Sequence, residues 1–266
     1  MNFSAIRFFI LDMDGTFYLG NRLLPGAKEF LQIISEQGKD FCFLTNNSSH
    51  SSIFYAQKLR KMGLLDFPSH KIVTSSQATI FYLSQIKPHP RVYLLGTSEL
   101  EIEFLQAGFS LVQKDPDFVV LGFDTSLTYQ KINRACQFIR KGVPFFATHP
   151  DLNCPTEEGP VIDAGSFIKA IEASTGCSPK VFGKPYQEMI EYILQKTQTK
   201  KEEVAIIGDR LYTDIAMGKK AGITTILVLT GETKKEEVKN SPWQPDFIFN
   251  SLEEINNYFK KEIKNV

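Results

Sequence analysis

Short apolar runs with strand character alternate with amphipathic helical stretches along most of the chain. The runs are rich in Phe, Ile, Val and Leu, and the stretches between them repeat apolar residues at helical spacing. This alternation predicts a parallel sheet with helices on both faces, the doubly wound, Rossmann-like α/β class. Strands are expected at Phe8–Leu11, 40–45, 71–75, Arg91–Leu95, Phe118–Leu121, Pro144–Thr148, 180–183, 203–209, 224–231 and 246–249. Helices are expected at 27–37, Ile53–Met62, Glu99–Ala107, Tyr129–Lys141, Ser166–Ala173, Tyr186–Lys196, Thr213–Ala221 and Leu252–Phe259.

The composition of the chain argues against several broad classes of protein. Its 266 residues are 42% hydrophobic, enough for one large core or for two domains. Basic and acidic residues balance at 30 each, which disfavours a nucleic-acid polymer or a membrane surface as partner. No run is long and apolar enough to span a bilayer, and the first residues lack a signal-peptide pattern.

The four cysteines, Cys42, Cys136, Cys154 and Cys177, form no C-x-x-C pair. A chain of this size and apolar content needs no disulfide staples, so we expect reduced thiols and a cytoplasmic protein. The sequence leaves the oligomeric state open, with a homodimer as one alternative.

Unusual polar residues follow four of the predicted strands. Because the carboxyl ends of parallel strands share one edge of a sheet, side chains from distant parts of the sequence should converge there. The residues are Asp12 and Asp14, Thr45 and Asn46, Lys184, and Asp209 with Asp214.

The predicted cluster combines several carboxylates with a lysine and with hydroxyl and main-chain donors. Clustered carboxylates repel one another, so a cation has to hold them together. A set of oxygen ligands without histidine or cysteine fits Mg²⁺ better than zinc, and Mg²⁺ is commonly shared with a phosphate group. Lysine and main-chain N–H groups suit the remaining phosphate charge. The chemistry indicated is phosphoryl transfer with an aspartate as nucleophile.

Four motifs in these positions resemble, in order, those of haloacid-dehalogenase-superfamily phosphatases. They are DMDGT at Asp12–Thr16, TNN at Thr45–Asn47, GKP at Gly183–Pro185 and GDRLYTD at Gly208–Asp214. The segments LLPGA, LTNNSS, THPD, DAGS and AIEASTG further resemble the NagD-like, or p-nitrophenylphosphatase-like, branch. The likeness extends along the whole chain.

The resemblance implies a role for each carboxylate. Asp12 would attack phosphorus and form an aspartyl-phosphate, and Asp14 would protonate the leaving alcohol and later deprotonate the hydrolytic water. Mg²⁺ would be held by the carboxylates of Asp12 and Asp209 and by the main-chain carbonyl of Asp14. Asp214 would orient water on the metal, or Lys184.

The resemblance also implies which groups bind the substrate phosphate. Thr45, Asn46 and Asn47 would hold its oxygens, and Lys184 would neutralise charge on the phosphate and the nucleophile.

In this branch an α/β cap domain is inserted into the catalytic core. Here the core would comprise 1–76 and 179–266, and the cap would comprise 77–178 and carry any dimer surface. The cap would close over the cleft and select the leaving group. A long polar loop, residues 149–165, lies within the cap. The position of this loop suggests that four of its side chains contact the substrate. They are His149, Asp151, Asn153 and Cys154.

Plainer interpretations exist for several of these residues. The Asp12–Gly15 segment is also typical of a turn, and Asn46 with Asn47 suits a helix N-cap. Lys184 has the features of a solvated loop lysine, and Asp214 those of an acid near a helix N-terminus. The histidines lack metal-ligand spacing, so His149 also fits a structural role.

The sequence therefore predicts a Mg²⁺-dependent phosphatase for small phosphomonoesters such as sugar phosphates or nucleoside monophosphates. A phosphomutase on the same core is one alternative, and a phospho-metabolite-binding regulator without turnover is another. A dinucleotide-binding oxidoreductase is disfavoured because no G-x-G-x-x-G follows the first strand.

Overall fold

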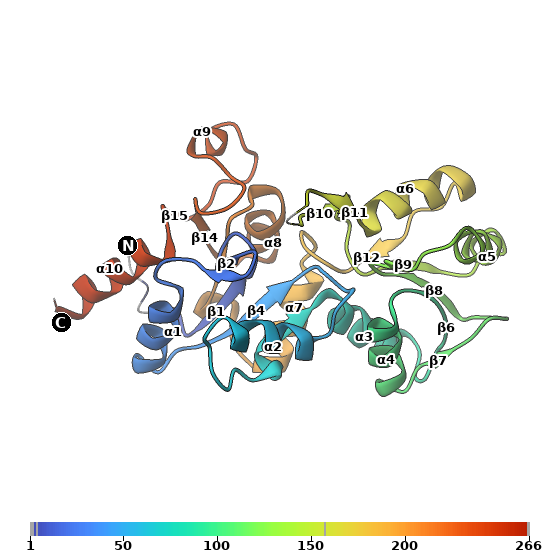
Figure 1. The fold of residues 1–266 in the computed structure, drawn as a ribbon, viewed down its shortest axis with the longest axis horizontal. Coiled ribbons are helices and arrows are strands. Elements are labelled where there is room, and N and C mark those ends of the chain that lie inside the picture. The colour runs from blue at the N-terminus through green and yellow to red at the C-terminus, as the bar shows by residue number, and fades with distance from the viewer. Residues whose placement is uncertain (1–2, 4, 157, 265–266) are drawn as a thin grey trace. The chain divides into compact units, whose positions relative to one another are not determined.

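The computed structural model describes residues 3, 5–156 and 158–264, and the chain forms two compact units. We call residues 1–45, 56–73 and 190–266 the first unit, and residues 46–55 and 74–189 the second unit. Both are α/β, as the alternation predicts (Figure 1). The start of the chain, where no signal sequence is expected, lies partly outside the described residues. The predicted cap boundaries at 77 and 178 stay a prediction.

The first unit is built on a six-stranded sheet in the order β15-β14-β13-β1-β4-β5. Its central strands β13, β1 and β4 pair in parallel, with Phe8 opposite both Val204 and Asp40. The strands are β1 (Phe8–Asp12), β4 (Asp40–Thr45), β5 (Ile72–Thr74), β13 (Val204–Gly208), β14 (Thr224–Val228) and β15 (Phe247–Phe249). A small hairpin, β2 (Tyr18–Leu19) and β3 (Arg22–Leu23), turns at Gly20-Asn21.

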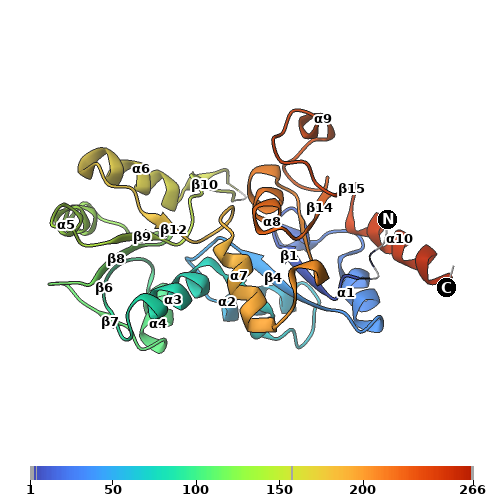
Figure 2. The ribbon, with the colours of Figure 1, turned by 180° about the vertical axis from the view of Figure 1, so that it is seen from behind.

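Helices cover both faces of this sheet. α2 (Ser52–Lys61) lies in front of it in Figure 1, and α7 (Glu188–Thr197) lies in front of it when the molecule is turned (Figure 2). Buried β1 is apolar at every position before Asp12, as expected for a strand covered on both sides. The remaining helices are α1 (Ala27–Glu36), α8 (Ala216–Ala221), α9 (Lys235–Val238) and α10 (Leu252–Lys264).

The second unit has a five-stranded parallel sheet in the order β12-β9-β8-β6-β7. Successive residues of β8 (Phe118–Leu121) enter opposite cores: Val119 and Leu121 pack with α5 and α6, whereas Phe118 and Val120 pack with α3 and α4. The other strands are β6 (Arg91–Leu95), β7 (Ser110–Leu111), β9 (Phe145–Ala147) and β12 (Lys180–Val181). The helices are α3 (Ser75–Ile86), α4 (Ser98–Gln106), α5 (Tyr129–Arg140) and α6 (Ala164–Thr175).

The structure corrects the sequence-based prediction at β12. This two-residue strand pairs with β9 in the sheet of the second unit, and Phe182 after it is buried in that unit's core. Lys184 therefore follows a strand of the second sheet. The expectation that all four sets of polar strand ends lie at the edge of one sheet is wrong for Lys184.

Three further elements differ from the prediction. Helix α3 was not anticipated, because its start is rich in serine and resembles a loop. The long polar loop contains an antiparallel hairpin, β10 (Asn153–Cys154) with β11 (Val161–Ile162). The helix expected from Thr213 begins at Ala216, after a π-helical turn at Leu211–Ile215. None of the helices among the described residues is long and apolar enough to cross a membrane.

Candidate active site

Asp12 is the last residue of the central strand β1, and it lies opposite Leu44 of β4. Thr45 is the next residue of β4, so Thr45 and Asp12 end neighbouring strands at the carboxyl edge of the sheet. On the other side of β1, Leu11 lies opposite Ile207, and β13 ends at Gly208, just before Asp209. Parallel pairing in this register thus places Asp12 between Thr45 and Asp209, as the sequence predicts.

Asp209 is buried, and its carboxylate is held by groups from two other segments of the chain. Its Oδ1 accepts a hydrogen bond from Thr16 Oγ1 at 3.3 Å, and its Oδ2 accepts one from the main-chain N–H of Glu232 at 2.7 Å. Two glycines leave room for this carboxylate. A Cβ atom on Gly231 would lie 1.9 Å from Asp209 Oδ2, and one on Gly15 would lie 2.6 Å from the same oxygen.

Asp214 is carried back to the strand ends by the π-helical turn. Gly208 permits this approach, because a Cβ atom there would lie 2.3 Å from the Cβ of Asp214. The carboxylate accepts hydrogen bonds from Arg210 N at 3.3 Å and Thr213 Oγ1 at 3.2 Å. π-Helical turns are frequently found at functional sites.

The carboxylates of Asp12, Asp209 and Asp214 form one cluster. An oxygen from each lies within 4.8 Å of the others, and the three residues are 9%, 1% and 0% exposed. Arg210 faces the same acids: burial opposes its charge, but Asp12, Asp209 and Asp214 raise the pKa of the guanidinium above its usual value. Arg210 Nε also lies 3.0 Å from Glu232 Oε2, so the four carboxylates and one guanidinium leave three negative charges. The cluster therefore has the oxygen donors and the negative charge to attract a divalent cation.

Asp14 lies in the turn that follows β1. The Gly15 N–H donates to Tyr18 O at 2.8 Å, and Gly15 has a φ of 83°, a conformation that glycine adopts without strain. Burial raises the pKa of the Asp14 carboxyl, and the nearby cations Lys58 and Arg210 only partly offset that effect. Asp14 therefore retains a proton more readily than an exposed aspartate.

The other predicted phosphate-binding residues lie in the second unit. Lys184 N donates to Asn46 Oδ1 at 2.7 Å, and Asn46 Nδ2 donates to Lys184 O at 3.0 Å. Gly183 allows this contact, since a Cβ atom there would lie 2.8 Å from Asn46 Oδ1. The Asn47 side chain accepts hydrogen bonds from Ser49 N and Oγ, at 2.9 and 2.7 Å, and so shapes the turn after β4.

The residues predicted in the long loop divide into two groups. Asp151 accepts hydrogen bonds from Asn46 Nδ2 at 3.1 and 3.2 Å, and Cys154 Sγ lies 3.6 Å from Asn47 Nδ2. Both therefore lie beside predicted phosphate-binding residues of their own unit. Asn153 is exposed in β10 and His149 is fully buried.

His149 has both ring nitrogens in hydrogen bonds. Nδ1 lies 2.8 Å from Thr148 Oγ1, and Nε2 lies 2.9 Å from Asp163 Oδ1. Thr148 in turn bonds to Ser48, and Asp163 also caps α6. We therefore assign His149 a structural role instead of the substrate contact expected from its loop position. Its ligand atoms, with those of Asp151 and Asp163, lie within 4.8 Å of one another, but the hydrogen bonds described above already engage all three side chains.

We expect His149→Gln to lower the free energy of unfolding by about 3 kcal/mol at pH 6, because Asp163 would keep a buried charge without its partner. Burial disfavours the imidazolium, but Asp163 and Asp151 outweigh it and raise the pKa of His149. The His149–Asp163 pair therefore contributes fully to the free energy of unfolding below about pH 6.5. This contribution is lost as the pH rises through the raised pKa of His149. Urea unfolding from pH 5.5 to 8.5 measures the difference between the two proteins, which should shrink with rising pH. His70→Gln, at an exposed histidine, is the control, and a difference that is constant with pH would contradict the charged pair.

The predicted site residues thus form two groups, one in each unit. Asp12, Asp14, Thr45, Asp209 and Asp214 belong to the first, and Asn46, Asn47, Lys184 and the loop residues belong to the second. The sequence analysis missed Arg210, Thr16 and Gly231. Arg210 was visible inside GDRLYTD, whereas nothing in the sequence links Gly231 to Asp209.

Comparison with known proteins identifies the family of the chain. A family model described as haloacid dehalogenase-like hydrolase matches residues 9–110, and a second hydrolase model of the same kind matches residues 181–255. An acid sugar phosphatase of Staphylococcus aureus is 35% identical over 247 residues, covering 92% of this chain and 95% of the relative. The chain belongs to the haloacid dehalogenase-like hydrolases. The predicted resemblance to the NagD-like, or p-nitrophenylphosphatase-like, branch is confirmed as well.

Solved structures extend the likeness to the fold. A 4-nitrophenylphosphatase from Thermotoga maritima is 48% identical, with a TM-score of 0.93 over 96% of this chain and 98% of that one. A glycerol phosphate phosphatase from Mycobacterium tuberculosis, solved in complex with magnesium, is 28% identical, with a TM-score of 0.87 over 95% of this chain and 77% of that one. The protein is a phosphoric monoester hydrolase of this family that acts on small phosphorylated substrates.

Proposed function

We propose that the protein hydrolyses small phosphomonoesters with Mg²⁺ and through an aspartyl-phosphate on Asp12. The cluster of buried carboxylates from Asp12, Asp209 and Asp214 is the observation that carries this proposal. All its donors are oxygens, which Mg²⁺ prefers, and its net negative charge attracts a divalent cation. The M. tuberculosis relative, which is solved with magnesium, supports the same choice of metal.

Asp12, Asp209 and the main-chain carbonyl of Asp14 would hold the metal. When bound, Mg²⁺ supplies positive charge that offsets the repulsion among the carboxylates and the charge of the substrate phosphate. Thr16 and the Glu232 N–H fix the direction of the Asp209 carboxylate, and Asp214 is held beside it by the turn of residues 211–215. These contacts within the chain would hold the proposed metal ligands in place before Mg²⁺ binds.

In the first half of the reaction, an Asp12 carboxylate oxygen forms a bond to phosphorus while the bond from phosphorus to the ester oxygen breaks. Asp14 gives its proton to that departing oxygen, so the product leaves as a neutral alcohol. In the second half, a water oxygen forms a bond to the phosphorus of the aspartyl-phosphate while the bond from phosphorus to the Asp12 oxygen breaks, and Asp14 accepts a proton from the water. Inorganic phosphate is released and both carboxyl groups return to their starting state.

Thr45, Asn46, Asn47 and Lys184 are the proposed phosphate-binding residues. The hydroxyl and amide groups would donate hydrogen bonds to phosphate oxygens, and the lysine would supply positive charge. Asn46 and Lys184 act together in this proposal, because the side-chain amide of Asn46 is hydrogen-bonded to the main-chain N–H and carbonyl of Lys184.

Substrate choice is proposed to lie in residues 77–178, with Asp151, Asn153 and Cys154 as candidate contacts. The S. aureus relative is named an acid sugar phosphatase and the M. tuberculosis relative a glycerol phosphate phosphatase, which supports small phosphorylated polyols, sugar phosphates first, as substrates. All four cysteines are free thiols, which supports a reducing, cytoplasmic location.

Phosphate release from a panel of sugar phosphates, glycerol phosphate, nucleoside monophosphates and p-nitrophenyl phosphate tests the proposal. We expect release with Mg²⁺, at least about 10²-fold less after EDTA treatment, and recovery when Mg²⁺ is returned. Full activity after exhaustive removal of metal would contradict the metal-dependent mechanism. Absence of release from every ester by folded protein would contradict the assigned substrate class.

A further inference from the structure

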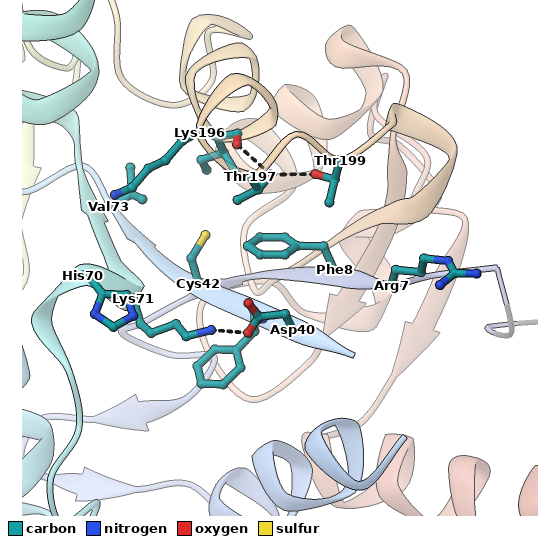
Figure 3. A pocket seen from close by; sticks show the side chains of 12 residues that line it. Arg7, Phe8, Asp40, Cys42, His70, Lys71, Val73, Lys196, Thr197 and Thr199 are labelled. Atoms are coloured by element: carbon teal, nitrogen blue, oxygen red, sulfur yellow. Dashed lines mark hydrogen bonds and ion pairs between the residues drawn. The ribbon is translucent and has the colours of Figure 1, made fainter. Parts of the chain in front are cut away.

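A cavity of about 400 Å³ opens in the first unit, at the amino ends of the strands (Figure 3). Phe8 and Asp40, which line it, begin β1 and β4, and the end of α7 closes another side. Its volume is within the range typical of sites for small molecules. Asp12 is at the other end of β1, four residues or roughly 13 Å along the strand, so the cavity is separate from the carboxylate cluster.

The floor of the cavity is apolar. Phe8, Cys42, Val73 and Ile193 line it and are buried. In Figure 3 the ring of Phe8 and the thiol of Cys42 lie between the helix and the strand that carry the polar groups. Burial raises the pKa of the Cys42 thiol to about 12, so the thiol stays protonated and behaves as an apolar surface. A ligand therefore needs an apolar body to cover this floor.

Two lysines stand above the floor. Lys71 is paired with Asp40, and the Asp40 carboxylate offsets the positive charge of this lysine. The Lys196 ammonium extends along the cavity toward Val73, and no carboxylate partner of Lys196 is found in the part of the chain that the structure describes. Both lysines line the same cavity as Cys42, so their charges lie near its floor. Arg7 contributes little, because its side chain points away and pairs with Glu203 at 3.2 Å.

The surplus of positive charge in the cavity is small. Lys71, Lys196 and Asp40 together carry one net positive charge, and the carbonyl end of α7 adds a partial negative charge. A single negative charge balances this arrangement, whereas a dianionic phosphate would be repelled by Asp40. Hydroxyl groups of Thr197 and Thr199, 2.7 Å apart, offer further polar contacts at the same side.

We propose that this cavity is a second ligand site, which binds a small organic monoanion, a carboxylate on a flat apolar body. The apolar body lies on the Phe8, Cys42 and Ile193 floor, and the carboxylate pairs with Lys196. The site is independent of the phosphatase reaction.

Calorimetric titration of the full-length protein with 2-naphthoate tests the assignment. We expect saturable binding of one molecule per chain, and binding about fivefold weaker in Lys196→Gln, the change expected when one charge contact is lost. Lys61→Gln is the matched control, an exposed lysine at the end of α2, and should bind as the wild type does. Asp12→Asn should also retain binding. Acetate, which has the charge without the apolar body, and phenylphosphonate, which carries up to two charges, should bind more weakly than 2-naphthoate.

Amide chemical shifts of ¹⁵N-labelled protein locate the ligand directly. On addition of 2-naphthoate, the largest changes should be at Cys42, Val73 and Thr197. Absence of saturable binding, binding unaffected by Lys196→Gln, or shifts centred on Asp12 would overturn the proposal. Tighter binding of phenylphosphonate than of 2-naphthoate would overturn the assignment of a monoanion.

Discussion

Asp12→Asn is expected to reduce the rate of phosphate release by about 10⁴-fold or more while leaving the fold intact. The amide has nearly the same shape as the carboxylate, so the packing around this largely buried residue is preserved. It has no negative oxygen with which to attack phosphorus, and it is a weaker ligand for Mg²⁺. One charge is also removed from a crowded acidic cluster, so the thermal midpoint without metal should stay close to that of the wild type.

Steady-state phosphate release with the best substrate of the panel measures this effect. Asp66→Asn makes the same chemical change at an exposed position of the first unit, and asparagine tolerates its φ of 58°. That control should keep wild-type activity. Residual activity of Asp12→Asn above about one per cent, in protein free of wild-type enzyme, would show that Asp12 is not the nucleophile.

The central strands could be predicted from the sequence because their burial on both faces gives each of them a continuous apolar run. β1 and β13 are buried on both faces, so each appears as an uninterrupted apolar run that ends at an aspartate. The order of these runs with helices between them is sufficient for a parallel sheet, since short connections cannot join parallel neighbours directly. Asp12 and Asp209 could therefore be predicted to lie at adjacent strand ends.

Elements that depend on distant partners could not be predicted in the same way. β12 has only two residues, and its place beside β9 is decided by the burial of Phe182 in the second unit. The β10–β11 hairpin is equally short and leaves no run of strand residues to detect. The burial of His149 depends on Asp163, fourteen residues away, and the pairing is not visible in either residue's local sequence.

The candidate site shows the same limit. Its acids occur in recognisable motifs, but several contacts that orient them come from residues outside the predicted set. Arg210 adds a positive charge that the acid count from sequence omits. Glu232 donates its main-chain N–H to Asp209 and pairs through its carboxylate with Arg210. A glycine such as Gly231 is unremarkable in sequence, because what matters there is the absence of a side chain.

Gly231→Ala is accordingly the second substitution for which we expect a large effect. The added Cβ would lie 1.9 Å from Asp209 Oδ2 and 2.5 Å from its Cγ, closer than the 3.0 Å below which real Cβ contacts are essentially never found. Either the Asp209 carboxylate or the main chain of the loop must therefore move by about an ångström. Because Glu232 N donates to the same oxygen, both outcomes disturb the hydrogen bond that orients Asp209.

We expect this displacement of Asp209 to weaken Mg²⁺ binding more than it lowers the stability of the fold. We expect the Mg²⁺ concentration for half-maximal activity to rise at least about 10-fold, and kcat/KM at saturating Mg²⁺ to fall by about 10²-fold. Gly222→Ala is the matched control: it has a φ of 73° and open space around it, so it should lower the free energy of unfolding by about 1 kcal/mol without changing the response to Mg²⁺. Mg²⁺ titrations of activity, with circular dichroism to verify folding, distinguish the two variants. A normal Mg²⁺ requirement in folded Gly231→Ala would show that the position of Asp209 does not control the metal site.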